Sequence, residues 1–175
     1  QLGAVPAMTA PSALTPTTGR PIDVLFMGGL DDRRGALLAD LAPELWTVKS
    51  DIRVFKFDRP VSSATPGVVF GTDKYDLLAS SKLLVNLHRS EESGGYFEWA
   101  RMVETMANGC VVLTEPSVDH DPLVDGEHFV SSMSGGLGGT LIDLLQDHDR
   151  RAELASQAQH AVLDTFPLSA SLGPL

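Results

Sequence analysis

The sequence has a single cysteine, no long apolar run and too few basic residues to balance its acidic ones. The lone cysteine, Cys110, cannot form an internal disulfide, which is compatible with a reducing compartment. No apolar run reaches about 18 residues, which excludes a membrane-spanning helix, and no basic segment followed by an apolar one marks a secretory signal. We therefore expect a cytoplasmic protein with no transmembrane segment.

Acidic residues outnumber basic ones by 23 to 13, which gives a formal net charge of −10. A protein that coats nucleic acid needs clustered lysine and arginine to bind phosphates, so we exclude nucleic acid as a partner. A local basic pocket remains compatible with this balance. Apolar residues make up 43% and charged residues 21% of the chain, which is the composition of a globular fold.

The chain length of 175 residues fits one domain. Residues 1–20 are rich in Pro, Thr and Ala, which predicts a flexible, partly extended lead-in or an interdomain linker. Residues 21–166 are predicted to form the domain, and residues 167–175 a C-terminal tail. Because the chain begins with Gln1 and not with Met, we expect a fragment or a processed product.

Short apolar runs alternate with segments of helical periodicity throughout residues 21–166. Strands are predicted at 22–27, 52–57, 83–88, 110–114 and 129–130, with a brief one at 68–70. Helices are predicted to begin near residue 32 and to cover 72–80, 96–107, 137–146 and 149–165. This alternation implies an α/β fold with a doubly wound, Rossmann-like parallel sheet. Such sheets bind ligands at the carboxyl ends of their strands, here the loops after Met27, His88 and Thr114.

The loop after the first strand combines glycines with two arginines. Gly28 and Gly29 permit close approach of a ligand to the backbone, and the following helix offers free N–H groups. Arg33 and Arg34 lie in the first helical turn, where positive charge opposes the helix macrodipole unless an anion binds there. The alternative is a solvated pair whose charge is offset by the two preceding aspartates.

The second loop leads into a helix with charged residues on one face. Gly94 and Gly95 precede this helix and form a second candidate cradle for an anion. Glu98, Arg101 and Glu104 are spaced three apart and so share one helical face. They could form a surface ladder of ion pairs. Because Glu104 has apolar neighbours, its carboxylate needs a partner, and the two hydroxyls of a ribose would suit it.

The remaining candidates point to structure more than to chemistry. The loop over residues 115–128 contains aspartates, a glutamate and two histidines, but their spacing matches no closed zinc or calcium pattern, so we predict a solvated acidic loop and no metal site. Cys110 opens an apolar strand and is predicted to be a small core residue, not a nucleophile. No Gly-x-Ser-x-Gly elbow is present, which excludes the usual α/β-hydrolase.

Four segments, taken in order, resemble the C-terminal, nucleotide-sugar-binding half of a GT-B glycosyltransferase, most closely the bacterial group-1 proteins. They are FMGGLDDRRGALLADL, SKLLVNLHRS, FEWARMVETMANGCVVLTE and DPLVDGEHFV. The likeness extends from Pro21 to about Phe166, and it rests on the order and spacing of motifs that are individually weak.

The resemblance implies roles for particular residues. Arg33 or Arg34 would neutralise the donor diphosphate, and the backbone around Gly94 and Gly95 would help to hold it. Glu104 matches the second glutamate of the family's Glu-x7-Glu motif, which contacts the ribose. The first glutamate of that motif falls at Tyr96, a departure for which another nearby glutamate would have to compensate.

The full set of donor-binding residues implied in this way covers all of the loops just described. It consists of Gly28, Gly29, Arg33, Arg34, His88, Arg89, Gly94, Gly95, Glu98, Arg101 and Glu104.

The activity implied is transfer of a sugar, as in a hexosyltransferase, from a nucleotide-diphosphate sugar to an unknown acceptor. Arginines and helix N–H groups would stabilise the leaving group, with no metal and no cofactor other than the donor substrate. An N-terminal acceptor domain in the parent chain would complete the enzyme. A non-catalytic module of the same fold, binding a nucleotide or a partner protein, is the alternative. A signalling receiver fits poorly, because the lysine it needs after its fifth strand is absent.

Overall fold

The computed structural model describes residues 3–55, 60, 62, 65, 68–89 and 95–171 of the chain. Within these residues five strands form one sheet in the order β2-β1-β3-β4-β5, and every neighbouring pair is parallel. The strands are β1 (Ile22–Gly29), β2 (Ser50–Phe55), β3 (Ser81–Asn86), β4 (Val111–Thr114) and β5 (Val130–Ser131). The doubly wound parallel sheet is therefore confirmed, whereas the brief strand predicted at 68–70 is absent from the described residues.

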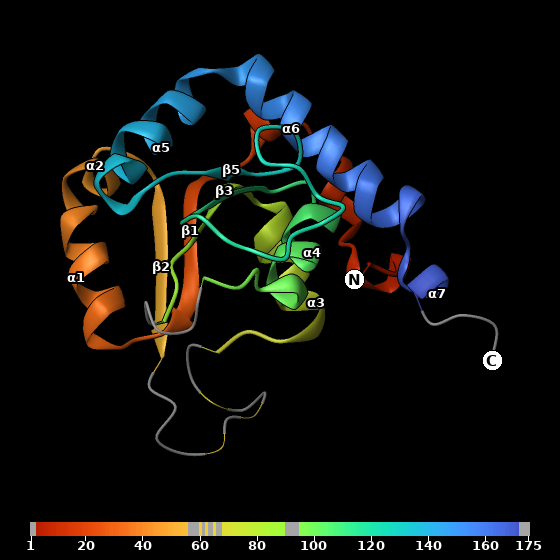
Figure 1. Ribbon diagram of the computed structural model, residues 1–175, viewed down its shortest axis with the longest axis horizontal. Helices are drawn as coiled ribbons and strands as arrows, with labels where there is room; N and C mark the ends of the chain where they lie inside the picture. Colours follow the sequence, from red (N-terminus) through yellow and green to blue (C-terminus); the bar gives the residue numbers. More distant parts are fainter. Residues whose placement is uncertain are drawn as a thin grey trace.

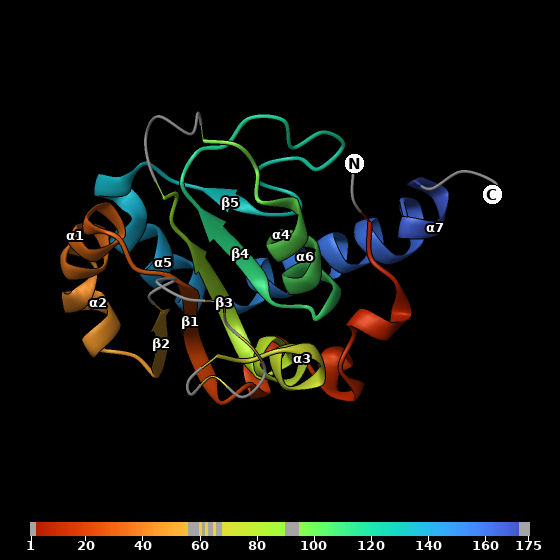
Figure 2. The same ribbon diagram turned by 90° about the horizontal axis from the view of Figure 1, so that it is seen from below.

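Helices cover both faces of this sheet (Figures 1 and 2). One face carries α1 (Asp32–Asp40), α2 (Ala42–Trp46) and α5 (Leu137–Gln146), and the other carries α3 (Gly71–Ala79) and α4 (Trp99–Ala107). The long helix α6 (His148–His160) runs from the first core to the second, followed by a π-helical turn, η5 (Ala161–Thr165), and by α7 (Leu168–Ser171).

The central strands are apolar on both sides because each faces a core. In β1, Val24 and Phe26 pack toward α2 and α5, whereas Leu25 packs toward Leu78 of α3. Adjacent residues of a strand point to opposite faces, so a doubly covered strand needs this continuous apolar pattern. At about 25 cal/mol per Å² of buried apolar surface, such strands supply much of the driving force for folding.

The strand order places a ligand-binding crevice at the carboxyl ends of β1 and β3. The chain passes from β1 outward to β2 and then returns to the other side of β1 to form β3. The helices that follow β1 and β3 therefore lie on opposite faces, which leaves an opening between the loops. The first of these helices, α1, begins as the sequence predicts, with the Asp31 carboxylate accepting a hydrogen bond from the Arg34 N–H at 2.8 Å.

The lead-in differs from the expectation of a flexible, partly extended segment. Residues 3–20 contain three 3₁₀ turns, η1 (Pro6–Met8), η2 (Pro11–Leu14) and η3 (Thr17–Gly19), and Ala4, Ala10 and Ala13 are buried. The side chain of Asn108, at the end of α4, donates to the Met8 carbonyl and accepts from the Ala10 N–H, both at 2.8 Å. Small alanines allow this close packing, which composition alone does not reveal.

The start of the chain also meets its C-terminal part. The Ala4 N–H donates to the Val162 carbonyl and the Ala4 carbonyl accepts from the Leu168 N–H, each at 3.0 Å. The expected tail at 167–175 thus includes the helical turn α7, and its last residues, 172–175, lie outside the described residues. Within the described ranges, no helix combines the length and the apolar character needed to cross a bilayer.

Arg20 anchors the lead-in and provides a test of this packing. Its buried guanidinium donates to the carbonyl oxygens of Ala13, Thr15 and Ser81 at 3.0–3.3 Å. We expect Arg20→Ala to lower the free energy of unfolding by about 2–4 kcal/mol in urea titrations, because those carbonyls lose a charged donor. The control Arg53→Ala, which removes a half-exposed edge-strand ion pair, should cost less than about 1 kcal/mol. Equal losses would contradict the anchoring role.

Candidate functional site

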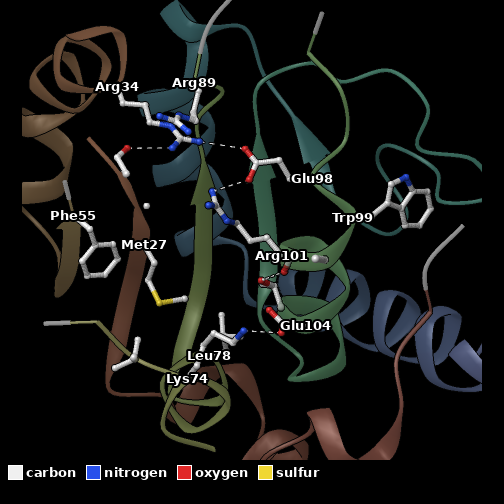
Figure 3. A pocket seen from close by; sticks show the side chains of 15 residues that line it. Met27, Arg34, Phe55, Lys74, Leu78, Arg89, Glu98, Trp99, Arg101 and Glu104 are labelled. Carbon is white, nitrogen blue, oxygen red and sulfur yellow. Dashed lines mark hydrogen bonds and ion pairs between the residues drawn. The ribbon is translucent and has the colours of Figure 1, made fainter. Parts of the chain in front are cut away.

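A cavity of about 640 Å³ opens at the carboxyl ends of β1 and β3, against the first turns of α4 (Figure 3). Glycines and arginines line one end, and apolar side chains with a lysine–glutamate pair line the other. The lining residues are Met27, Gly28, Gly29, Arg34, Phe55, Val69, Lys74, Leu78, Arg89, Glu98, Trp99, Ala100, Arg101, Glu104 and Thr105.

Arg34 is the most deeply buried charge of this cavity, with 2% of its side chain exposed. Its Nε donates to the Leu87 carbonyl at 2.8 Å, and its Nη1 donates to the Gly29 carbonyl at 3.1 Å. Burial, and then the nearby charge of Arg101, lowers the pKa of this guanidinium, whereas Glu98 raises it. The side chain remains a cation at neutral pH, because a guanidinium keeps its proton in folded proteins.

Glu98 lies between two arginines at the N-terminus of α4. One carboxylate oxygen is 3.2 Å from Arg34 Nη2 and the other is 3.2 Å from Arg101 Nη1 (Figure 3). Arg101 also donates to the Asn86 side-chain oxygen at 2.8 Å, which ties α4 to the end of β3. The shared helical face of Glu98, Arg101 and Glu104 is therefore confirmed, and it faces the cavity.

The far end of the cavity contains an ion pair that the sequence analysis missed. Lys74 of α3 donates to the Glu104 carboxylate at 2.6 Å, and both side chains are largely buried. Met27, Phe55 and Leu78 form an apolar wall beside this pair. Lys74 and Leu78 are four residues apart on α3, so the sequence already places them on one helical face. No pattern in the sequence indicates that this face of α3 packs against Glu104 of α4.

Arg33 takes a different position from its neighbour. It does not line the cavity but donates both Nη groups to the Glu115 carboxylate, at 2.5 and 2.9 Å, and Nη1 also to the His88 carbonyl at 2.9 Å. Burial by itself raises the pKa of the Glu115 carboxyl, but Arg33 and the His88 N–H outweigh it and hold the pKa below its usual value. Arg33 is thus paired with Glu115, whereas Arg34 lines the cavity.

The other predicted donor-binding residues divide in the same way. Gly28 and Gly29 line the cavity, and a Cβ at Gly28 would lie 3.3 Å from the Phe26 ring and 3.4 Å from Arg34 Nη1. Arg89 also lines it, with 68% of its side chain exposed. His88 lies outside the lining, its ring within hydrogen-bonding distance of the Pro116 carbonyl at 3.1 Å.

Only one glycine of the predicted cradle is described, and it does not line the cavity. Gly94 lies outside the described residues, as do the glutamates at 91 and 92. Gly95 is absent from the lining, has a φ of +63° and accepts from the Val118 N–H at 3.0 Å. The helix α4 begins at Trp99 and not at 96, so the first-turn residues that line the cavity are Trp99, Ala100 and Arg101.

Cys110 and the acidic loop take structural positions. Cys110 is fully buried, and burial raises the pKa of its thiol to about 12, which leaves almost no thiolate at neutral pH. In the loop, Asp125 accepts from the Ser131 N–H at 2.9 Å and His120 contacts the Leu123 carbonyl. Among the described residues, no three His, Cys, Asp or Glu side chains gather in a group that could hold a metal ion.

Comparisons with known proteins agree with this fold. The family model described as glycosyl transferase-like matches residues 46–170, more than half of the chain. The match includes Lys74, Glu98, Arg101 and Glu104, whereas β1 and α1 precede it. No curated protein sequence matches the chain.

Solved structures of glycosyltransferases share the fold at low identity. TarM is 13% identical over 87% of this chain and 34% of its own, with a TM-score of 0.60. The C-terminal domain of a group 1 family glycosyl transferase, LpcC from Francisella tularensis, is 14% identical over 82% of this chain and 85% of its own, with a TM-score of 0.58. AviGT4, a glycosyltransferase involved in avilamycin A biosynthesis, is 14% identical over 87% of this chain and 48% of its own, with a TM-score of 0.55.

These matches confirm the predicted fold, the Rossmann-like α/β domain of a GT-B glycosyltransferase. The chain spans 34% and 48% of the length of two of these proteins and most of the isolated C-terminal domain of the third.

The Arg33–Glu115 pair predicts how stability depends on pH. A carboxyl with a lowered pKa stabilises the fold fully above its unfolded pKa of about 4.3, and this contribution is lost as the pH falls through the folded value. We expect Glu115→Gln to cost about 2 kcal/mol at pH 7 in urea unfolding, and to show a smaller loss of stability than wild type below pH 4 or so. The exposed Glu127→Gln variant should follow wild type throughout. Parallel pH profiles of wild type and Glu115→Gln would refute the assignment.

Proposed function

This chain belongs to the glycosyl transferase-like family, and we propose that it is the domain that binds the sugar donor, a nucleotide-diphosphate sugar. The observation that carries the proposal is the division of one cavity into a cationic end and an apolar end with a carboxylate. Its volume of about 640 Å³ is typical of a small-molecule site, for which roughly 300–1,000 Å³ is usual.

The cationic end suits the donor diphosphate. Arg34, Arg89 and Arg101 come from three different segments, and the first turn of α4 adds backbone N–H groups at the positive end of a helix. When the glycosidic bond of the donor breaks, negative charge grows on the departing diphosphate. Cations fixed at that point stabilise this charge more in the transition state than in the substrate. Arg33 contributes indirectly, since it fixes the loop around Glu115 and His88.

The other end suits the nucleoside. A carboxylate can accept hydrogen bonds from the two hydroxyls of a ribose, and Glu104 lies beside the apolar wall of Met27, Phe55 and Leu78 on which a base can pack. Lys74 orients the Glu104 carboxylate through their hydrogen bond. The order of the two ends along the cavity thus matches the order of base, ribose and diphosphate in the donor.

In the reaction, the bond between the sugar's anomeric carbon and the diphosphate oxygen breaks, and an acceptor hydroxyl forms the new bond. The nucleoside diphosphate leaves with the electron pair, and the hydroxyl proton passes to a base. We assign no base to this chain. In full-length relatives of the fold much of the chain lies outside the matched region, and we propose that an N-terminal acceptor domain supplies the acceptor-side groups.

One observation favours a second candidate, a non-catalytic nucleotide-binding module of the same fold. Tyr96 stands where the first glutamate of the Glu-x7-Glu motif is expected, and 62% of it is exposed, paired with Val118 and away from the cavity lining. A catalytic domain needs another contact to the sugar. Turnover of a bound nucleotide sugar, measured with the full-length protein, separates the two candidates.

Donor binding is directly testable by thermal unfolding. At a concentration of about 100 times Kd, a ligand that binds only the native state adds about 2.7 kcal/mol, which for a domain of this size raises Tm by about 5–10 °C. We expect at least one of UDP, GDP, ADP and dTDP, and its sugar conjugate, to produce such a shift. The absence of any shift across this panel would count heavily against the proposal.

The ribose contact is tested by Glu104→Gln. We expect the Kd for the active nucleoside diphosphate to rise about tenfold, because a charged hydrogen bond contributes about 1.5–3 kcal/mol, whereas binding of inorganic pyrophosphate should not weaken. Glu153→Gln on α6 removes the same charge far from the cavity and serves as the control in isothermal titration calorimetry. An unchanged Kd in Glu104→Gln would show that Glu104 does not contact the nucleotide.

A further inference from the structure

We infer that Glu98 is a resident anion of the donor cavity: its carboxylate occupies the position between Arg34 and Arg101 that the donor's diphosphate takes over, and it competes with the nucleoside diphosphate product for those two arginines. The inference rests on the proposed function, since it concerns the same cavity. It assigns Glu98 to positioning and release, not to contact with the sugar.

The geometry of the carboxylate supports this assignment. Each of its oxygens faces a different guanidinium, Arg34 Nη2 and Arg101 Nη1, both at 3.2 Å. The other hydrogen bonds of the two guanidinium groups are to uncharged oxygens, those of Gly29 and Leu87 for Arg34 and of Asn86 for Arg101. A single bridging carboxylate therefore provides the ion pair of both cations, as two oxygens of a phosphate group would.

The position of Glu98 in α4 makes this orientation informative. Glu98 is the N-cap residue, where a side-chain oxygen usually accepts from a backbone N–H of the first turn, yet its carboxylate makes no such bond. It extends toward the two arginines instead (Figure 3). Two guanidinium groups thus converge on one place, and a carboxylate of the protein lies between them.

The difference in burial shows which partner moves. Arg34 is 2% exposed and fixed by backbone carbonyls, whereas 32% of the Glu98 side chain is exposed. Displacing Glu98 into solvent hydrates its carboxylate and breaks only its two ion pairs, while moving Arg34 would break three contacts. The arginines remain in place in the empty cavity because Glu98 offsets their mutual repulsion.

The cavity charges favour displacement by a diphosphate. The Lys74–Glu104 pair is neutral as a unit, so the three cations Arg34, Arg89 and Arg101 face two carboxylates, Glu98 and Asp31, the second of which lies 3.9 Å from Arg89 Nε. A diphosphate brings at least two negative charges and can reach the exposed Arg89 as well, so it exceeds what one carboxylate offers. After transfer, the returning carboxylate competes with the product and promotes its release.

The experiment compares wild type, Glu98→Gln, Glu98→Asp and Glu153→Gln by isothermal titration calorimetry with inorganic pyrophosphate, a probe that needs no knowledge of the base. We expect Glu98→Gln to bind pyrophosphate about five- to tenfold more tightly than wild type, since no ion pairs must break first. Glu98→Asp keeps the charge but is too short to bridge both arginines, so its affinity should be intermediate. Glu153 forms an equivalent pair with Arg150 three residues earlier on α6, and Glu153→Gln should match wild type.

Thermal unfolding gives an independent readout. Without ligand, Glu98→Gln should melt below wild type because Arg34 and Arg101 then repel each other without an intervening anion, and saturating pyrophosphate should remove the difference. If the ligand fails to remove it, Glu98 has an ordinary structural role and the inference is wrong.

Four further outcomes would overturn the inference. Weaker or unchanged pyrophosphate binding in Glu98→Gln excludes competition, and so does a lack of pyrophosphate binding by both proteins. If Glu98→Asp bound pyrophosphate as wild type does, the effect would depend only on the net charge of the cavity and not on a carboxylate that bridges the two arginines. Weaker binding of a nucleotide sugar with unchanged binding of the diphosphate would instead identify Glu98 as a sugar ligand. Failure of the proposed function differs from failure of this inference. In that case no nucleoside diphosphate or nucleotide sugar binds the wild-type protein, whether or not pyrophosphate binds.

Discussion

The binding edge of this protein depends on how one buried guanidinium is held. Arg34 follows the first strand. Its guanidinium donates to the Gly29 carbonyl at the end of β1, to the Leu87 carbonyl just beyond β3, and to the carboxylate of Glu98, the N-cap residue of α4. A buried arginine needs such acceptors, because an unpaired buried charge is expensive. Meeting this requirement brings together the three segments that line the cationic end of the cavity.

The same solution recurs elsewhere in the fold. Arg20 donates to carbonyls of the lead-in and of β3, and Arg151 donates to the Leu144 and Leu145 carbonyls at the end of α5, where the helix dipole favours a cation. An acidic chain with a net charge of −10 thus buries arginines among backbone oxygens. The cationic end of the cavity contains Arg34, Arg89 and Arg101. Arg33, which the sequence also places in the donor-binding set, is paired with Glu115 instead.

The cavity lies at one edge of the sheet and combines three arginines, the first turn of α4 and the Glu104 carboxylate. Two of the glycosyltransferases that share the fold are two to three times as long as the matched region. In the function we propose, the cavity binds the donor and stabilises its charge, and the acceptor-side groups come from outside the matched region.

The sequence by itself determined the fold class and the general location of the site. Doubly apolar runs such as that of β1 require a parallel sheet covered on both faces, and the spacing of Glu98, Arg101 and Glu104 fixes one helical face wherever α4 packs. Which of two adjacent arginines faces the cavity was decided by the tertiary structure, because Glu115 is 82 residues from Arg33 along the chain. The Lys74–Glu104 pair and the packed lead-in were decided in the same way. Local periodicity specifies faces, but partners distant in sequence become neighbours only when the strands assemble in their non-sequential order.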